Sequence, residues 1–148
     1  MDISEKTEKR LRNLFDSQLN AALATSKDGK PYCCLVSFFV TDDFKHLLFA
    51  TKRARLKYEQ MDANPSVALL IENTTNQPED VTQAISVSVL GTAKDVKGAD
   101  RLDYADQLAE RHPKLEQFVH SEDTAIMRVT IAKMYVVTNF EEVEVVDL

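Results

Sequence analysis

The sequence predicts an α+β domain, in which an antiparallel sheet of about six to seven strands curls into a small barrel with peripheral helices. Three observations favour this class. Apolar runs with strand character follow one another across turn signals, most connections are short, and no internal repeat is visible. A length of 148 residues suits one compact domain, so a single domain is expected over residues 1–148.

The expected elements follow the periodicity of the apolar residues. Ser4 can cap a first helix, in which Leu11 and Leu14 recur on one face. Asp28 and Gly29 stand between two apolar runs and predict a hairpin. The expected strands cover residues 19–26, 31–41, 46–50, 67–71, 125–138 and 141–146, with one more from 85 to near Gly91 or Val96. The further expected helices lie between Thr51 and Asn64, over 99–111 and over 113–120.

The segment 72–83 is polar almost throughout and nearly lacks apolar anchors. Such a segment can bury too little surface to offset the entropy of ordering it. We therefore expect a mobile loop there.

The acidic composition disfavours several classes of partner. The formal net charge is -6 and the isoelectric point is about 5.1, which is the wrong sign for general attraction to phosphate backbones or anionic lipid. No apolar run approaches the roughly 18 residues of a membrane span. We therefore expect no nucleic acid and no membrane as partner.

A cytoplasmic location is expected, and it suits reduced thiols at the adjacent Cys33 and Cys34.

Several catalytic motifs are missing. The three glycines, Gly29, Gly91 and Gly98, cannot form a dinucleotide fingerprint or a Walker-type phosphate loop, and there is no Gly-x-Ser-x-Gly elbow. The histidines and cysteines lack the spacing of metal ligands, so no metal is expected. A nucleophilic cysteine is the less favoured reading of the thiols, because it needs a base and a lowered pKa.

One charge pattern points to a ligand. If a helix begins at Thr51, its first residues are basic and its later residues are acidic, whereas the helix dipole favours the opposite order by roughly 0.3 to 1 kcal/mol per charge. The basic residues are Lys52, Arg53, Arg55 and Lys57, and the acidic ones are Glu59 and Asp62. An anion at the helix start would reverse this penalty, and phosphate suits the unpaired N–H groups and the Thr51 hydroxyl. The alternative is that the basic chains extend into water, with Arg55 paired to Glu59.

A series of short motifs runs through nearly the whole chain. They are Leu23-Ala24-Thr25-Ser26, Asp28-Gly29, Pro31, Leu48-Phe49-Ala50-Thr51, Lys57, Asn64-Pro65 and Gly91. Their order and spacing resemble the pyridoxamine 5'-phosphate oxidase-like flavin-binding split barrels. The resemblance implies an antiparallel split barrel, a homodimer, and FMN at the subunit interface.

The resemblance also implies which residues bind the FMN phosphate. Thr51 and Lys57 match family positions that hold this group. Leu56 stands where the oxidases carry an arginine, and Arg55 is expected to supply that charge from the neighbouring position.

A second set of residues is implied for the flavin ring. Val36, Ser37 and Phe38 match the strand whose backbone groups meet the edge of the isoalloxazine. Ser86 and Ser88 match the strand that carries a glutamine in the oxidases.

The chain departs from the oxidases at the substrate side. The oxidases carry an arginine and a lysine on the second strand, where this chain has apolar residues around Leu35 and Val40, and it has no Trp. Oxidation of vitamin B6 is therefore not expected. The leading hypothesis is an FMN-dependent oxidoreductase of unknown small-molecule substrate, in which the flavin carries the redox chemistry and no catalytic side chain is needed.

Two alternatives stay open. The first is a non-catalytic carrier of flavin, deazaflavin or haem, with His46, His112 or His120 as the haem ligand to test. The second is a structural dimer with an empty groove, in which the basic cluster serves solubility.

The barrel is expected to form a homodimer that buries apolar strand faces between the subunits. Phe38, Phe39 and Val136 are the candidates for this interface.

Overall fold

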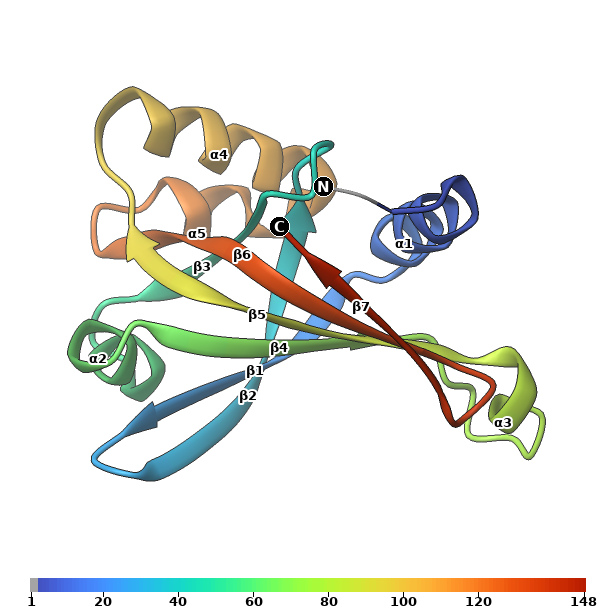
Figure 1. Cartoon of the computed structure of the whole chain (residues 1–148). Helices are drawn as coiled ribbons and strands as arrows, with labels where there is room; N and C mark the ends of the chain where they lie inside the picture. The colour runs from blue at the N-terminus through green and yellow to red at the C-terminus, as the bar shows by residue number, and fades with distance from the viewer. Residues whose placement is uncertain (1–2) are drawn as a thin grey trace.

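The computed structural model describes residues 3–148 and shows a seven-stranded antiparallel sheet in the order β3-β2-β1-β4-β5-β6-β7, closed by a further pairing of β3 with β6. The strands are β1 (Asn20–Lys27), β2 (Lys30–Val40), β3 (His46–Lys52), β4 (Ser66–Glu72), β5 (Ile85–Asp95), β6 (Thr124–Thr138) and β7 (Glu142–Asp147). Strands β1 to β6 form a closed barrel, in which β3 and β6 meet, and β7 extends the sheet beyond β6 (Figure 1). The predicted α+β split barrel is confirmed.

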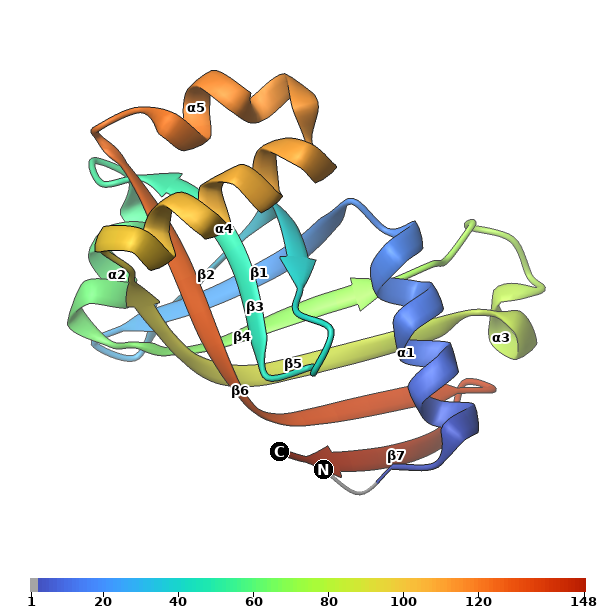
Figure 2. The same cartoon turned by 90° about the horizontal axis from the view of Figure 1, so that it is seen from above.

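The helices lie outside the barrel. They are α1 (Glu5–Ser17), α2 (Leu56–Ala63), α3 (Asp80–Gln83), α4 (Gly98–Arg111) and α5 (Glu116–His120), and a 3-10 turn, η1 (Pro113–Leu115), joins the last two. Figure 2 shows α4 and α5 side by side on one side of the barrel, while α2 and α3 lie at opposite ends. Among residues 3–148, none of the helices has the length and apolar character needed to cross a membrane.

Two local predictions from the sequence are confirmed. The hydroxyl oxygen of Ser4 accepts a hydrogen bond of 3.2 Å from the backbone N–H of Thr7 and so caps α1. Asp28 and Gly29 have φ angles of 53° and 75°, as a tight hairpin turn between β1 and β2 requires.

The apolar residues form two cores. Alternate residues of the strands, such as Leu23, Phe49 and Val87, fill the barrel, and α1 closes it with Leu14 and Phe15. A second core packs α4 and α5 against the outside of β2, β3 and β6. It contains Phe39, Leu48, Ala105, Leu108, Val119 and Ile126. A groove lined by Lys57 lies beside this second layer.

The expected subunit interface is wrong in its residues. Phe38 and Val136 are 0% and 3% exposed within the barrel core, and Phe39 is 8% exposed in the second core. Their side chains are therefore buried by their own chain and are not available to a second copy.

The segment 72–83 contains the short helix α3, which the sequence did not predict. The carboxylate of Asp80 accepts hydrogen bonds from the backbone and hydroxyl of Thr75 and from the backbone of Gln77. The segment therefore holds its shape through local polar contacts, since it has few apolar side chains to bury. The mobility of this segment stays a prediction.

Candidate functional site

The turn between β3 and α2 differs from the expected helix start. β3 continues through Lys52 because its last residues pair with β6, where Lys52 lies opposite Thr124. The helix begins only at Leu56, with Arg55 as its N-cap residue. A helix start at Thr51 is therefore wrong.

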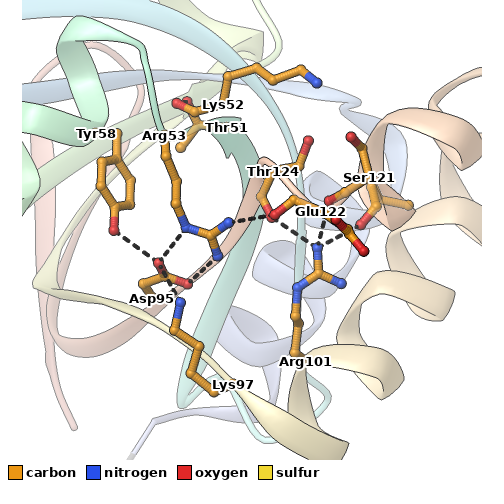
Figure 3. Close-up of polar contacts among 11 residues, drawn as sticks. Thr51, Lys52, Arg53, Tyr58, Asp95, Lys97, Arg101, Ser121, Glu122 and Thr124 are labelled. Carbon is orange, nitrogen blue, oxygen red and sulfur yellow. Dashed lines mark hydrogen bonds and ion pairs between the residues drawn. The ribbon is translucent and has the colours of Figure 1, made fainter.

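Two of the four clustered basic residues are paired inside the protein. Lys52 Nζ lies 2.8 Å from the Asp123 carboxylate. Arg53 forms a two-point contact with Asp95 at 3.1 and 3.3 Å (Figure 3). The proximity of Lys52 and a hydrogen bond from Ser121 lower the pKa of Asp123 to about 2.

Arg55 and Lys57 are left as the cations of the turn. Neither forms an ion pair within residues 3–148. The alternative pair of Arg55 with Glu59 is wrong, because Glu59 instead accepts a hydrogen bond of 3.0 Å from Lys27. The N–H groups of the first turn of α2 lack partners within the helix, so they and the two cations offer donors to an anion.

Lys57 lies at a groove between the barrel and the helical layer. The groove has a volume of about 210 Å³, and its walls include Val36 and Ser37 of β2, Ala50 of β3, and Leu115 and Phe118 from the α4–α5 region. The structure thus brings together three of the predicted site residues, Val36, Ser37 and Lys57. Lys57 is the charged residue of its lining, and the rest of the lining is apolar except for Ser37.

A second groove continues from the first, because Ser37 and Leu115 line both. It has a volume of about 470 Å³ and includes Asn20 and His112. The Ser37 hydroxyl donates a hydrogen bond of 3.1 Å to the side-chain oxygen of Asn20. Asn20 was not among the residues expected at the site, and His112 was named only as a possible haem ligand, because only the β1–β2 pairing and the turn after α4 bring them beside Ser37.

Two other predicted site residues are less accessible. Thr51 is 1% exposed, and its hydroxyl donates only to the carbonyl of Lys52, at 3.3 Å. Phe38 has both backbone groups engaged: its N–H donates to the carbonyl of Leu19, and its carbonyl accepts from His112. Within one chain, Thr51 is therefore buried beneath the turn between β3 and α2. The backbone of Phe38 connects β2 to Leu19 and to His112.

Ser86 and Ser88 lie away from the groove. They point outward from β5, alternating with the buried Val87 and Val89. Ser88 lies opposite Leu70 of β4, and β1 stands between β4 and β2. One chain therefore does not bring these serines to Lys57.

Ser88 belongs to a mostly apolar row across the outer face of the sheet. Strand pairing places Leu35, Ala22, Leu70, Ser88, Tyr135 and Val145 side by side in this order. Leu35, Leu70 and Val145 are 71%, 43% and 48% exposed. We call this set the outer row. Contiguous exposed apolar side chains of this kind are typical of an interaction surface.

The electrostatics near the groove also involve a thiol. Burial raises the pKa of Cys34, and the nearby charge of Lys57 partly offsets this rise. The other thiol, Cys33, is exposed on the outer face of β2. Within the described residues, no three His, Cys, Asp or Glu side chains gather as metal ligands would.

Comparison with known proteins gives a family match over most of the chain. The family model described as pyridoxamine 5'-phosphate oxidase matches residues 7–138. No curated protein matches the sequence.

Several solved structures share the fold. A heme binding protein from Mycobacterium smegmatis superposes with a TM-score of 0.83 at 12% identity, over 99% of this chain and 60% of that one, so this chain is considerably shorter. An FAD-binding protein from Mesorhizobium loti gives 0.70 at 19% identity, over 90% and 94% of the two chains. The heme storage protein HutZ from Vibrio cholerae gives 0.74 at 14% identity, over 87% and 93%. At such identities these likenesses show the fold alone.

Proposed function

Because the chain belongs to the pyridoxamine 5'-phosphate oxidase family, we propose that it binds FMN between two copies of itself and serves as an FMN-dependent oxidoreductase of a small-molecule substrate. The observation that supports this most is the groove beside β2, with Lys57 at its edge and Arg55 on the adjoining turn. Lys52 and Arg53 are neutralised by Asp123 and Asp95, so the two remaining cations can face an anion.

The donor set at the start of α2 fits a phosphate. Arg55 is exposed and offers a forked guanidinium, and Lys57 offers an ammonium group. The N–H groups of the first helical turn add uncharged donors in the direction of the positive end of the helix dipole. Thr51 is buried, so it contributes by supporting the turn.

The groove of one chain is small for a flavin. Its volume of about 210 Å³ lies below the range of about 300 to 1,000 Å³ that is usual for cofactor-sized ligands. A second copy would supply the missing wall, and the outer row gives it an apolar surface on which to dock. In such a dimer Ser86 and Ser88 of the partner copy can approach the ring, which one chain alone does not allow.

The proposed chemistry divides between the cofactor and the protein. FMN, when bound, supplies the transfer of hydride or electrons. The chain's own residues bind and orient: Lys57 and Arg55 hold the phosphate, Ser37 presents its hydroxyl beside the groove, and Leu115 and Phe118 exclude water from it. No side chain is required as an acid or base.

A haem carrier is the second candidate, because two of the structural relatives bind or store heme. Of the three histidines, His112 lines the larger groove, but its Nε2 is held by the carbonyl of Phe38. His120 lies 3.3 Å from Asp106 on the surface, and burial lowers the pKa of His46. Binding a haem iron through His112 Nε2 would require breaking its bond to Phe38, which favours flavin.

An absorption spectrum of the purified protein, with identification of the released chromophore, tests the proposal. Bound FMN supports it, and its bleaching by NADH or NADPH followed by reoxidation supports the oxidoreductase. Isolation of haem, or failure of added FMN to bind, would overturn the flavin assignment. Tight FMN binding without any reduction by either nicotinamide would support a passive flavin carrier instead.

A further inference from the structure

The carboxylate of Asp95 collects donors from three directions. Arg53 contacts both of its oxygens, Tyr58 Oη donates to Oδ2 at 2.9 Å, and Lys97 Nζ donates to Oδ2 at 3.1 Å (Figure 3). The Asp95 side chain is 14% exposed, whereas that of Lys97 is 68% exposed. The inner contacts with Arg53 and Tyr58 are therefore the ones shielded from water.

These two inner donors stand on either side of the turn that carries the free cations. Arg53 precedes Arg55, and Tyr58 follows Lys57 in the first turn of α2. Asp95 lies at the end of β5, far away in the sequence. One carboxylate thus ties both ends of the segment 53–58 to the barrel.

Arg53 also reaches a second anchor. Its Nη1 donates a hydrogen bond of 2.8 Å to the carbonyl of Glu122, and its backbone N–H donates to the carbonyl of Asp123. Arg101 Nη2 holds the neighbouring carbonyls of Ser121 and Thr124 at 3.2 and 2.8 Å. These bonds fix the connection from α5 to β6. Because Arg53 bonds to this connection, they also hold the start of the segment 53–58.

The charge state of Asp95 agrees with a persistent contact. Burial alone would raise the pKa of Asp95, but the hydrogen bonds from Arg53, Lys97 and Tyr58 lower it below its ordinary value. The carboxylate consequently remains ionised throughout the neutral range, and its contacts hold at the pH at which a phosphate would bind.

We infer that Asp95, Arg53 and Tyr58 form a clasp that holds the segment 53–58 in the shape that presents Arg55 and Lys57 to the phosphate of the ligand. Asp95 and Arg53 are positioning residues and do not contact the ligand. This inference rests on the proposed function for the identity of the ligand, but the clasp itself is a property of the protein without ligand. Ordering the two long cationic chains and their turn beforehand lowers the entropy lost on binding.

Asp95→Asn is the decisive variant, because it keeps the shape of the side chain and removes its charge. Tyr58→Phe is a milder second variant that removes one hydroxyl and is expected to fold even if Asp95→Asn does not. Asp123→Asn is the matched control. It removes the carboxylate that pairs with the neighbouring Lys52, and the Asp123 side chain is 70% exposed. Hydrogen exchange of the amides of residues 53–59 is measured without ligand, and affinities are measured for FMN and for riboflavin.

The clasp predicts faster exchange in residues 53–59 for Asp95→Asn and, to a smaller extent, for Tyr58→Phe. FMN affinity should fall about tenfold in Asp95→Asn, while riboflavin affinity stays within about twofold. Asp123→Asn should match the parent in both measurements. Equal losses for FMN and riboflavin, or unchanged exchange in both clasp variants, would overturn the inference.

Failure of the proposed function gives a different pattern. If the parent protein binds neither FMN nor riboflavin, inorganic phosphate is the probe. Protection of residues 55–57 by phosphate in the parent, and its loss in Asp95→Asn, would then support the clasp and reject flavin. Absence of phosphate protection in the parent would reject an anion site at Arg55 and Lys57, whereas unchanged exchange without ligand in both clasp variants would reject the clasp.

Discussion

His112 Nε2 lies 2.9 Å from the carbonyl oxygen of Phe38, and this bond joins the turn after α4 to β2. A carbonyl only accepts, so Nε2 carries a proton and donates it to this bond. The imidazole is 8% exposed, so its loss would leave a buried carbonyl unpaired next to Ser37.

Replacing His112 should therefore cost stability. We expect His112→Ala to lower the free energy of unfolding by about 1–3 kcal/mol, the usual cost of leaving a buried polar group without its partner. Urea denaturation measures this. His120→Ala, which removes a histidine paired with Asp106 on the surface, is the control and should cost less than about 1 kcal/mol. Equal costs for the two variants would show that the Phe38 contact adds nothing.

The cations of the α2 turn give the most direct test of the site. Arg55→Ala and Lys57→Ala should each weaken FMN about tenfold to a hundredfold, because a charge-assisted hydrogen bond contributes roughly 1.5 to 3 kcal/mol. Riboflavin, which lacks the phosphate, should be nearly indifferent, and the proteins without ligand should be no less stable than the parent. Titration of both ligands into both variants and the double variant checks this. Unchanged FMN affinity in all three would show that the phosphate is bound elsewhere.

The local parts of the fold could be predicted from the sequence. The Asp28-Gly29 turn and the Ser4 cap depend on residues close in the chain, and their backbone requirements are specific to those residue types. The basic cluster itself was visible in the sequence. Its position relative to the helix was not, because the end of β3 is set by pairing of Lys52 with Thr124, which no local pattern records.

The missing information was long-range pairing of charges. The sequence does not distinguish the four cations of the cluster. In the structure, Asp123 and Asp95, which are distant in the sequence, pair with Lys52 and Arg53. Likewise, alternation in β2 shows that its residues face two sides, but not that Phe39 faces α4 and is covered by it. The interface was therefore assigned to the most apolar positions, which are buried. The exposed outer row instead includes Leu35, whose neighbours on the same face of β2, Cys33 and Ser37, are small or polar.

The outer row should be the dimer contact. We expect the parent protein to sediment as a homodimer at micromolar concentration and Leu70→Asp to sediment as a monomer, because a carboxylate would be buried without a partner in the centre of the row. Leu102→Asp on α4 is the control, since Leu102 is also exposed, at 57%, but lies on another face. A monomeric parent that nevertheless binds FMN would contradict the shared site.

Gly91 is required by close packing between β5 and β6. A Cβ atom at this position would lie 2.3 Å from the carbonyl oxygen of Thr130 and 2.8 Å from a methyl group of Val129, at a bulge in the ladder. Backbone cannot yield as a flexible side chain does, so Gly91→Ala should cost about 3 kcal/mol of unfolding free energy. Gly98→Ala, with a φ of +70° and nothing within 4 Å, should cost only about 1 kcal/mol of backbone strain. Thermal or urea denaturation showing equal costs would contradict the packing argument.

The thiol of Cys34 can report on Lys57. Burial raises the pKa of this thiol and the Lys57 ammonium lowers it, because a nearby positive charge stabilises the thiolate. Lys57→Ala should therefore move the pH midpoint of Cys34 alkylation to higher pH, and saturating FMN should act in the same direction by neutralising Lys57. The experiment uses a Cys33→Ser background, since Cys33 is exposed and would react first.

Lys94→Ala, which removes an exposed lysine on β5, serves as the control and should leave the midpoint unchanged. A midpoint that is the same with and without Lys57 would mean that its ammonium group points away from Cys34. A shift with Lys57→Ala but none with FMN would instead leave the lysine in place and put the phosphate elsewhere.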